Sequence, residues 1–265
     1  MFVRDPTDSI KDNIPLGKQR NFESHMFFTP CSGIWQSVFI ESVPNDYITD
    51  IDINADKNGN VNGVIHTINE SSNGEFKFIL KSRIQNKVIG SFTSKVNQNF
   101  SFTFKDMKLW SINEPNLYDV EIHYENDKIE SYIGFRTVSI GLIEGIPRPL
   151  VNDEWVFQLA TLDEGYWPDS LYVPPTKEAM EFDIKFLKSL GFTTIRKHIK
   201  VENDEYYAFC DKIGMLVWQD MPSLMHDRYP TDDQVLEFER QAVEIVKTHK
   251  HFPSIVTWVL YNEGK

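Results

Sequence analysis

The stretch Thr193-Thr-Ile-Arg-Lys-His-Ile-Lys-Val-Glu-Asn-Asp-Glu-Tyr-Tyr-Ala-Phe-Cys-Asp-Lys-Ile-Gly-Met-Leu-Val-Trp-Gln-Asp220 decides the fold class of the C-terminal part of the chain. It predicts a strand over 193–197, a short helix over 202–212 that ends at Gly214, and a fully apolar strand over 215–218. A strand, a helix and a second buried strand in this order are typical of a parallel α/β sheet.

The same alternation extends in both directions from this stretch. A helix over 176–190 has apolar residues at helical spacing, with Thr176 as its N-cap and Gly191 directly after its end. The remaining predicted elements are a strand over 155–162, a helix over 232–249 and a strand over 255–260. Right-handed crossovers would join these strands into one parallel sheet. A complete (β/α)₈ barrel needs about 250 residues, so this region predicts only the first half of one.

Polar residues follow each predicted strand of this sheet. In parallel barrels the active site lies at the carboxyl ends of the strands, so these residues are the candidates for chemistry. The four clusters are Asp163 to Trp167, Arg196 to His198, Gln219 with Asp220, and Asn262 with Glu263. One polar residue after a strand is usually a loop start or a helix cap, but four successive clusters indicate a site.

Residues 46–140 show a different pattern, of short β-type runs separated by polar turns. The predicted strands are Tyr47 to Ile53, Val61 to Ile68, Phe76 to Ile84, Phe100 to Phe104, Tyr118 to Tyr124 and Ile129 to Ile140. Turns such as Lys57-Asn-Gly-Asn60 tolerate positive φ or close hairpins. The pattern predicts an antiparallel, immunoglobulin-like sandwich of roughly seven strands.

The first 35 residues contain several helix and strand breakers and little periodicity, which indicates loop rather than a closed domain. A strand-like run follows from Trp35 to Val43, and a lone strand needs a sheet to join. We expect these residues to be the end of a domain that begins upstream.

Composition excludes several classes of protein. The 265 residues carry a formal charge of −12, which disfavours nucleic acid as a partner. No run approaches the roughly 18 apolar residues of a membrane-spanning helix, and the first residues lack a signal-peptide core, so no membrane partner is expected and the compartment stays open.

Cysteine and histidine spacing predicts neither a disulfide nor a metal site. Cys31 and Cys210 lie far apart, and Cys210 follows aromatic residues on a predicted helix face, which favours a buried thiol. His226, His249 and His251 show no ligand spacing. We therefore expect no metal and no cofactor.

An ordered set of motifs resembles glycoside hydrolase family 2, the group of β-galactosidases, β-mannosidases and β-glucuronidases. The matching stretches are Arg4 to Asp8 with Gly17 to Gln19, Ser32 to Gln36, Leu109 to Ser111 with Pro115 to Tyr118, Gly134 to Arg136, Gly165 to Asp169, Leu190 to Phe192 with Ile195 to His198, Cys210 to Gly214, Leu216 to Asp220, and Trp258 to Gly264. Each fragment is weak, but the set runs in family order over nearly the whole chain.

The resemblance implies an architecture that is truncated at both ends. Residues 1–43 would be the C-terminal remnant of a jelly-roll sugar-binding domain, residues 44–141 the immunoglobulin-like sandwich, and residues 142–265 the N-terminal half of a (β/α)₈ catalytic barrel. The nucleophile of such enzymes follows the seventh strand and would be absent here, so we expect the chain to be inactive alone.

The resemblance also implies roles for individual residues. Glu263 would be the catalytic acid/base and Asn262 would bind the sugar 2-hydroxyl. Arg196 would hold the nucleophile carboxylate. For the other three substrate-binding candidates both functional and structural roles stay open: His198 as ligand or core residue, Asp220 as hydroxyl binder or support, and Trp167 as stacking floor or packing residue.

The expected function is hydrolysis of terminal β-linked sugars with retention, and the expected partner is a carbohydrate substrate. The alternative is a non-catalytic remnant or a carbohydrate-binding or interaction protein. A sandwich lectin fused to an unrelated α/β fragment would require the motif order to arise by chance. The sugar that is cleaved and the oligomeric state stay open.

Overall fold

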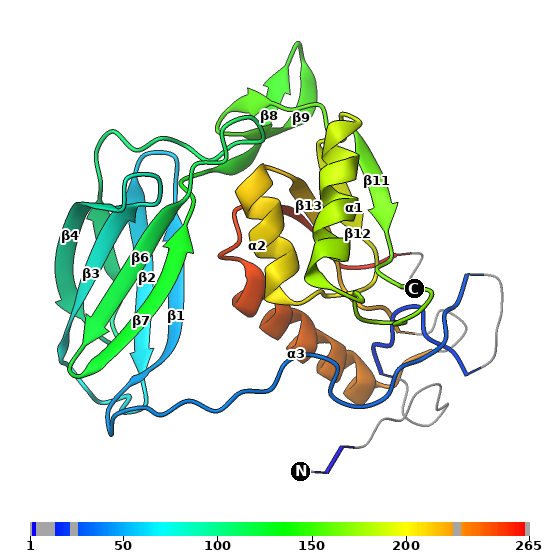
Figure 1. Cartoon of the computed structure of the whole chain (residues 1–265), viewed down its shortest axis with the longest axis horizontal. Coiled ribbons are helices and arrows are strands. Elements are labelled where there is room, and N and C mark those ends of the chain that lie inside the picture. Colours follow the sequence, from blue (N-terminus) through cyan, green and yellow to red (C-terminus); the bar gives the residue numbers. More distant parts are fainter. Residues whose placement is uncertain (1, 4–13, 22–25, 225–228, 263–265) are drawn as a thin grey trace. The chain divides into compact units, whose positions relative to one another are not determined.

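The computed structural model describes residues 2–3, 14–21, 26–224 and 229–262, which form two compact units (Figure 1). One unit comprises residues 39–157 and 251–253, and the other comprises residues 1–38, 158–250 and 254–265. Each unit is described by itself below. The domain boundaries drawn from the sequence, 43/44 and 141/142, stay a prediction.

The first unit contains three antiparallel sheets, two of which are formed by the strands that come first along the chain. These strands are β1 (Ile48–Ala55), β2 (Asn60–Thr67), β3 (Glu75–Ser82), β4 (Lys87–Lys95), β5 (Phe100–Thr103), β6 (Tyr118–Tyr124) and β7 (Asp127–Ile133). One sheet has the order β1-β2-β5 and the other β4-β3-β6-β7. These two sheets hold seven strands, of which the sequence predicted six individually, and the immunoglobulin-like sandwich stays a prediction.

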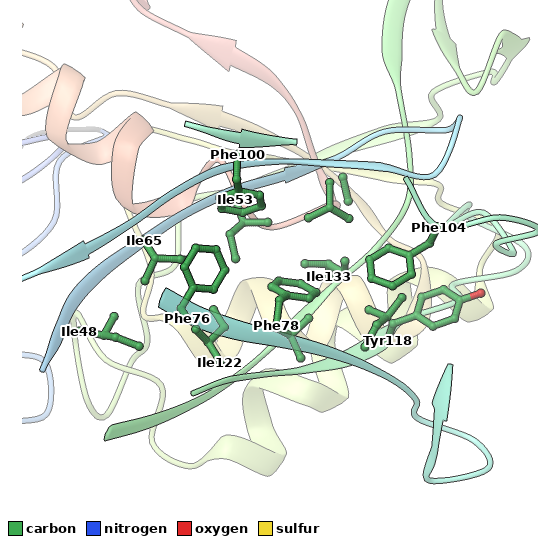
Figure 2. Close-up of a cluster of buried hydrophobic side chains, with 14 of the residues drawn as sticks. Ile48, Ile53, Ile65, Phe76, Phe78, Phe100, Phe104, Tyr118, Ile122 and Ile133 are labelled. Atoms are coloured by element: carbon green, nitrogen blue, oxygen red, sulfur yellow. The ribbon is translucent and has the colours of Figure 1, made fainter. Parts of the chain in front are cut away.

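The core of this unit lies on one face of each of these two sheets. In β6 every second residue is buried, namely Tyr118, Val120, Ile122 and Tyr124, because successive side chains of a strand point to opposite faces. Figure 2 shows Ile122 with Phe76 and Phe78 of β3, which are all fully buried. Removing these apolar side chains from water supplies most of the driving force for this unit.

A third sheet follows within the same unit and corrects two sequence predictions. It consists of β8 (Val138–Ile143), β9 (Ile146–Val151) and β10 (Glu154–Trp155), in the order β10-β9-β8. The predicted strand Ile129 to Ile140 is therefore two strands in two sheets; between them the Arg136 N–H donates to the Ala55 carbonyl at 3.3 Å. Trp155 belongs to β10, not to the opening strand of the parallel sheet.

The structure differs from the sequence analysis at two further places. Strand β4 was not predicted, since its polar residues and Gly90 hide the alternation. The predicted strand from Trp35 to Val43 is not formed, and Ile40 within it is 98% exposed. A strand forms when its backbone N–H and C=O groups bond to a neighbouring strand. Without such a neighbour these groups bond to water, so an apolar composition alone does not make a strand.

The second unit holds a four-stranded parallel sheet in the order β11-β12-β13-β14. The strands are β11 (Ala160–Asp163), β12 (Thr194–Lys197), β13 (Leu216–Asp220) and β14 (Ile255–Val259), and all three pairings are parallel. The helices α1 (Lys177–Ser189), α2 (Asp204–Ile213) and α3 (Asp232–His249) alternate with them along the chain. The predicted strand–helix alternation is confirmed.

Local signals define the helix ends. The Thr176 hydroxyl accepts from the Ala179 N–H at the start of α1, and the Asn203 side chain accepts from the Tyr206 N–H at the start of α2. Gly214 ends α2 at φ +73°. Within the described ranges, no helix is long and apolar enough to span a bilayer.

Candidate active site

The carboxyl ends of β12, β13 and β14 bring together side chains that are far apart in sequence. Arg196 of β12 donates to Asp220 of β13 along one edge of its guanidinium group: Nε lies 3.1 and 3.2 Å from the two carboxylate oxygens, and Nη2 lies 2.9 Å from Oδ2. The same Nη2 donates to Asn262 Oδ1 at 2.9 Å. A planar, permanently charged guanidinium suits such a fixed arrangement.

His198 completes this cluster from the loop after β12. Its Nδ1 lies 2.7 Å from Asp220 Oδ2, and the two side chains are only 5% and 1% exposed, whereas Arg196 is 29% exposed. Asp220 is thus a buried carboxylate shared by a cation and an imidazole. When Nδ1 carries the proton of a neutral imidazole, Nε2 is the acceptor nitrogen of His198.

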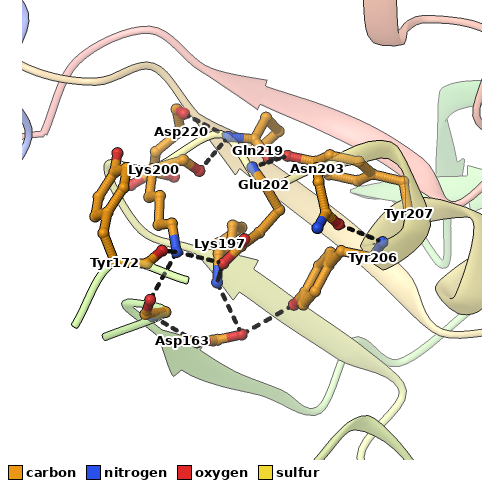
Figure 3. Close-up of polar contacts among 11 residues, drawn as sticks. Asp163, Tyr172, Lys197, Lys200, Glu202, Asn203, Tyr206, Tyr207, Gln219 and Asp220 are labelled. Carbon is orange, nitrogen blue, oxygen red and sulfur yellow. Dashed lines mark hydrogen bonds and ion pairs between the residues drawn. The ribbon is translucent and has the colours of Figure 1, made fainter. Parts of the chain in front are cut away.

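A second group of charges lies next to this cluster, on β11, β12 and the segment that follows β12; Lys197, Lys200 and Glu202 are buried and Asp163 is half-buried (Figure 3). Lys197 pairs with Asp163 at 3.2 Å and with Glu202 at 2.5 Å. Lys200 pairs with the same Glu202 oxygen at 2.9 Å. Two ammonium groups and two carboxylates offset one another, which is how charges are tolerated in an interior.

Burial and pairing oppose each other in the pKa values of this group. Burial acts to raise the pKa of Asp163, but the neighbouring Lys197 and the hydrogen bonds from Tyr206 and Gly165 outweigh it and leave that pKa lowered. The pKa of Lys197 is raised, because its two carboxylates outweigh its burial. Burial lowers the pKa of Lys200 to about 8, against the attraction of Glu202.

Gln219 and Tyr207 connect the two groups of charges. Gln219 Nε2 donates to the Lys200 and Asp220 carbonyls, and its Oε1 accepts from the Tyr207 hydroxyl at 2.6 Å. The Tyr207 hydroxyl in turn accepts from the Glu202 N–H. Gln219 is fully buried, so this residue from the predicted clusters supports the loop rather than facing a ligand.

Of the predicted site residues that the structure describes, Trp167 is not joined to the cluster around Asp220 by a hydrogen bond or ring contact. Trp167 lies in the loop after β11, half-buried, where its backbone pairs with Leu171. No hydrogen bond or ring contact joins its side chain to Arg196 within the described part of the chain. Glu263 lies outside the described residues. Sequence reasoning missed Lys200 and Glu202, because neither directly follows a strand.

A cavity of about 410 Å³ lies beside β11 and α1. Asp163, Glu164, Tyr166 and Asp183 line it, whereas Arg196, His198 and Asp220 do not. Over the described ranges, no group of three or more His, Cys, Asp and Glu side chains could hold a metal ion. Cys31 and Cys210 are both free thiols, as predicted, and Cys210 is buried.

Comparison with known proteins supports a glycosidase architecture. Residues 38–136 match the family described as Glycosyl hydrolases family 2. A β-galactosidase of Halalkalibacterium halodurans is 26% identical over 261 residues, and a β-mannosidase B of Emericella nidulans is 25% identical over 256 residues. Each alignment covers 88% of this chain but only 25% and 30% of the respective relative.

Solved structures give the same answer for the fold. A β-glucuronidase from Ruminococcus gnavus, solved with D-glucaro-d-lactam, superposes with a TM-score of 0.73 at 18% identity. The superposition covers 84% of this chain and 38% of that enzyme's chain.

The fold is that of a multidomain protein in which β-rich and parallel α/β parts occur together, and its relatives are glycosyl hydrolases. The chain resembles glycoside hydrolase family 2, as the ordered motifs indicated, and spans a quarter to a third of the curated relatives cited.

Proposed function

We propose that this chain carries part of the active site of a retaining glycoside hydrolase that cleaves terminal β-linked sugars. The observation that carries the proposal is the hydrogen bond from Arg196 to Asn262, because it ties the residue before Glu263 to the buried Asp220. The names of the relatives, which act as β-galactosidase and β-mannosidase, support this class of substrate.

The architecture proposed with it is that of the family. The seven antiparallel strands β1–β7 support an immunoglobulin-like sandwich, and the parallel order β11-β12-β13-β14 supports the first half of a (β/α)₈ barrel. Residues 1–43 are the proposed remnant of a jelly-roll domain. Other βα units would complete the barrel.

Glu263 is the proposed proton donor. Retaining hydrolysis needs one carboxylic acid that protonates the leaving oxygen and one carboxylate about 5–5.5 Å away that attacks the sugar. The first would be Glu263, and the second is the nucleophile that such enzymes carry after the seventh strand. With only one of the two groups, the 265-residue chain is proposed to show no turnover alone.

The contacts refine the proposed roles of the neighbouring residues. Asn262 Oδ1 accepts from Arg196, which leaves the amide N–H group of Asn262 to donate to the sugar 2-hydroxyl. Asp220 accepts from both Arg196 and His198, which favours support over direct hydroxyl binding. Arg196 and His198 are then the groups held for the substrate or the nucleophile, and Trp167 is the proposed stacking surface.

The test begins with sequencing the gene on both sides of these 265 codons and expressing the whole reading frame. We expect it to hydrolyse an aryl β-galactoside, β-mannoside or β-glucuronide. Glu263→Gln should slow cleavage of alkyl glycosides by orders of magnitude and of dinitrophenyl glycosides much less, because a good leaving group needs no proton. Equal losses on both substrates would show that Glu263 is not the acid.

The alternative, a non-catalytic or carbohydrate-binding protein, predicts a different result. A reading frame that ends without further βα units, together with no cleavage of any of the three glycosides, would favour it. Saccharide binding by such a product would then distinguish a binding protein from a remnant.

A further inference from the structure

Lys200 is buried with all three of its ammonium N–H groups in use. Nζ donates to the Gly165 carbonyl at 2.7 Å, to the Tyr172 carbonyl at 2.6 Å and to Glu202 at 2.9 Å. Its side chain is 0% exposed. Hydrogen bonds from a charged donor are about twice as strong as neutral ones, and a buried ammonium that loses an acceptor is left with an uncompensated cost.

The two carbonyls belong to opposite ends of one loop. Residues 164–173, which we call the β11 loop, leave the sheet after Asp163 and return toward α1. Inside the loop the Trp167 N–H donates to the Leu171 carbonyl at 2.7 Å, and the Leu171 N–H donates to the Trp167 carbonyl at 2.9 Å. Lys200 therefore joins the two ends of the β11 loop, and backbone hydrogen bonds within the loop hold its tip.

Aromatic rings enclose the ammonium group and extend the connection to the N-terminal segment. Nζ lies 4.4 Å from the ring centre of Tyr172, 5.9 Å from Tyr166 and 5.6 Å from Trp35. Phe28 stacks on Tyr166 at 4.0 Å between ring centres, and Trp35 meets Tyr172 edge to face at 4.8 Å. All of these residues belong to the same compact unit.

Gly165 shows how closely the loop approaches the charges. A Cβ atom at this position would lie 2.3 Å from Lys197 Nζ, 2.4 Å from Glu202 Oε1 and 3.0 Å from Lys200 Nζ. The backbone also has φ +68° there, which favours glycine. The backbone of Gly165 therefore packs directly against the buried charges, and no space is left for a side chain at this position.

We propose that Lys200 is a positioning residue that binds both ends of the β11 loop and so sets the place of Trp167. The claim that Trp167 then meets a sugar rests on the proposed function, but the closure of the loop by Lys200 does not. Lys200 touches no substrate in this scheme and acts only through the two carbonyls.

The variant that tests the proposal is Lys200→Met in the 265-residue chain, with the exposed Lys212→Met as matched control. Tryptophan is replaced by 5-fluorotryptophan, and the Trp167 ¹⁹F resonance is assigned with Trp167→Phe. We expect Lys200→Met to shift and broaden that resonance and to speed amide exchange at Trp167 and Leu171 by about tenfold or more. Amides of β6 and the Lys212→Met protein should be unchanged; an unchanged Trp167 signal in Lys200→Met would overturn the proposal.

A titration of the unmutated chain keeps the test decisive if Lys200→Met fails to fold. Deprotonation of Nζ near pH 8 leaves two N–H groups for three acceptors, so the Trp167 resonance should move with that midpoint. The groups that face Nζ are Asp163, Lys197, Glu202, Tyr166 and Tyr172; burial raises the pKa of both tyrosines further from this range. The ionisation of Lys200 is followed directly by the ¹³Cε signal of that side chain, and a Trp167 resonance that stays constant while Lys200 titrates would contradict the proposal.

Sugar addition separates this inference from the proposed function. Methyl β-D-galactoside, methyl β-D-mannoside and methyl β-D-glucuronide are added to the fluorotryptophan-labelled chain. If one of them moves the Trp167 resonance in the unmutated protein but not in Lys200→Met, both claims gain support. If Lys200→Met releases the loop and no sugar moves the resonance, the positioning role of Lys200 is supported and the sugar-stacking role of Trp167 is contradicted.

Discussion

At the scale of single residues, Asp220 decides whether the candidate site keeps its shape. We expect Asp220→Asn to lower the free energy of unfolding by about 1–3 kcal/mol, because Arg196 loses its buried counter-charge and His198 loses a charged acceptor. Urea denaturation measures this loss. In the complete enzyme, kcat should also fall, since the Arg196 guanidinium is no longer fixed against Asn262.

Asp119→Asn provides the control for that substitution. Asp119 pairs with Arg83 on the first unit, and both side chains are about 40% exposed. An exposed ion pair of this kind contributes about 0–1 kcal/mol, so the control should stay close to the parent protein. Equal effects of the two substitutions would mean that the Asp220 cluster is no more than a surface pair.

Lys200 gives the protein a pH dependence with a definite sign. Burial lowers its pKa to about 8 from an ordinary 10.5, so between these values the unfolded chain binds the proton and the folded chain does not. The free energy of unfolding should therefore rise with pH in this window, by on the order of 1–3 kcal/mol from this group. Below pH 8 both states are protonated and the cost of burying the charge is fully present.

The measurement is the difference in urea stability between the parent chain and Lys200→Met, taken at several pH values from 7 to 10.5. Other lysines titrate in both proteins and drop out of the difference to first order. The difference should change in favour of the parent chain as pH rises. A difference that is flat, or that falls with pH, would show that the pairing with Glu202 dominates and that the Lys200 pKa is not lowered.

At the scale of elements, the β11 loop depends on a glycine in a left-handed conformation. Gly165→Ala should cost about 2 kcal/mol or more, because the new Cβ would meet Lys197 and Glu202 as well as an unfavourable φ. Gly191→Ala is the matched control, since Gly191 has φ +92° with no atom within 4 Å of its Cβ position. Thermal denaturation measures the loss of stability in both variants, and the extra loss in Gly165→Ala is the cost of the steric clash. Similar melting temperatures would show that only the backbone strain contributes.

Elements with local signals could be predicted from the sequence, and elements that depend on partners could not. The Thr176 hydroxyl caps the start of α1, and Gly191 and Gly214 follow the two helices with positive φ, so α1 and α2 were predicted to within two residues. Strand β4 is held by pairing with β3. The run from Trp35 to Val43 has the composition of a strand but pairs with no sheet, and the absence of a pairing partner could not be predicted from its composition.

The candidate site followed the same division. Arg196, His198, Asp220 and Asn262 were predicted because carboxyl ends of parallel strands meet at one edge of a sheet. Which of them bind one another could not be predicted, since the contacts of Asp220 with Arg196 and His198 depend on the register of the strands. Lys200 and Glu202 escaped notice because only the folded loop brings them to Gly165.

At the scale of the whole molecule, the open parallel sheet predicts self-association of the 265-residue chain. In the described residues β11 and β14 each pair on one side only. On α1, Phe182 and Phe186 are 63% and 52% exposed and stack on each other at 6.0 Å. Unpaired edges beside exposed apolar side chains are typical of association surfaces.

We expect the purified chain to sediment as oligomers and Phe182→Lys/Phe186→Lys to shift most of it to monomer. The control is Ile84→Lys, which also replaces an exposed apolar residue by lysine but lies in the first unit, outside α1. Sedimentation velocity over a concentration series distinguishes the three proteins. If the parent chain is monomeric and residues 150–265 resist protease, the sheet is closed without further βα units, and the half-barrel proposal fails with it. If Ile84→Lys dissociates the oligomer as well as the α1 variant does, the association depends on net charge rather than on the apolar face of α1.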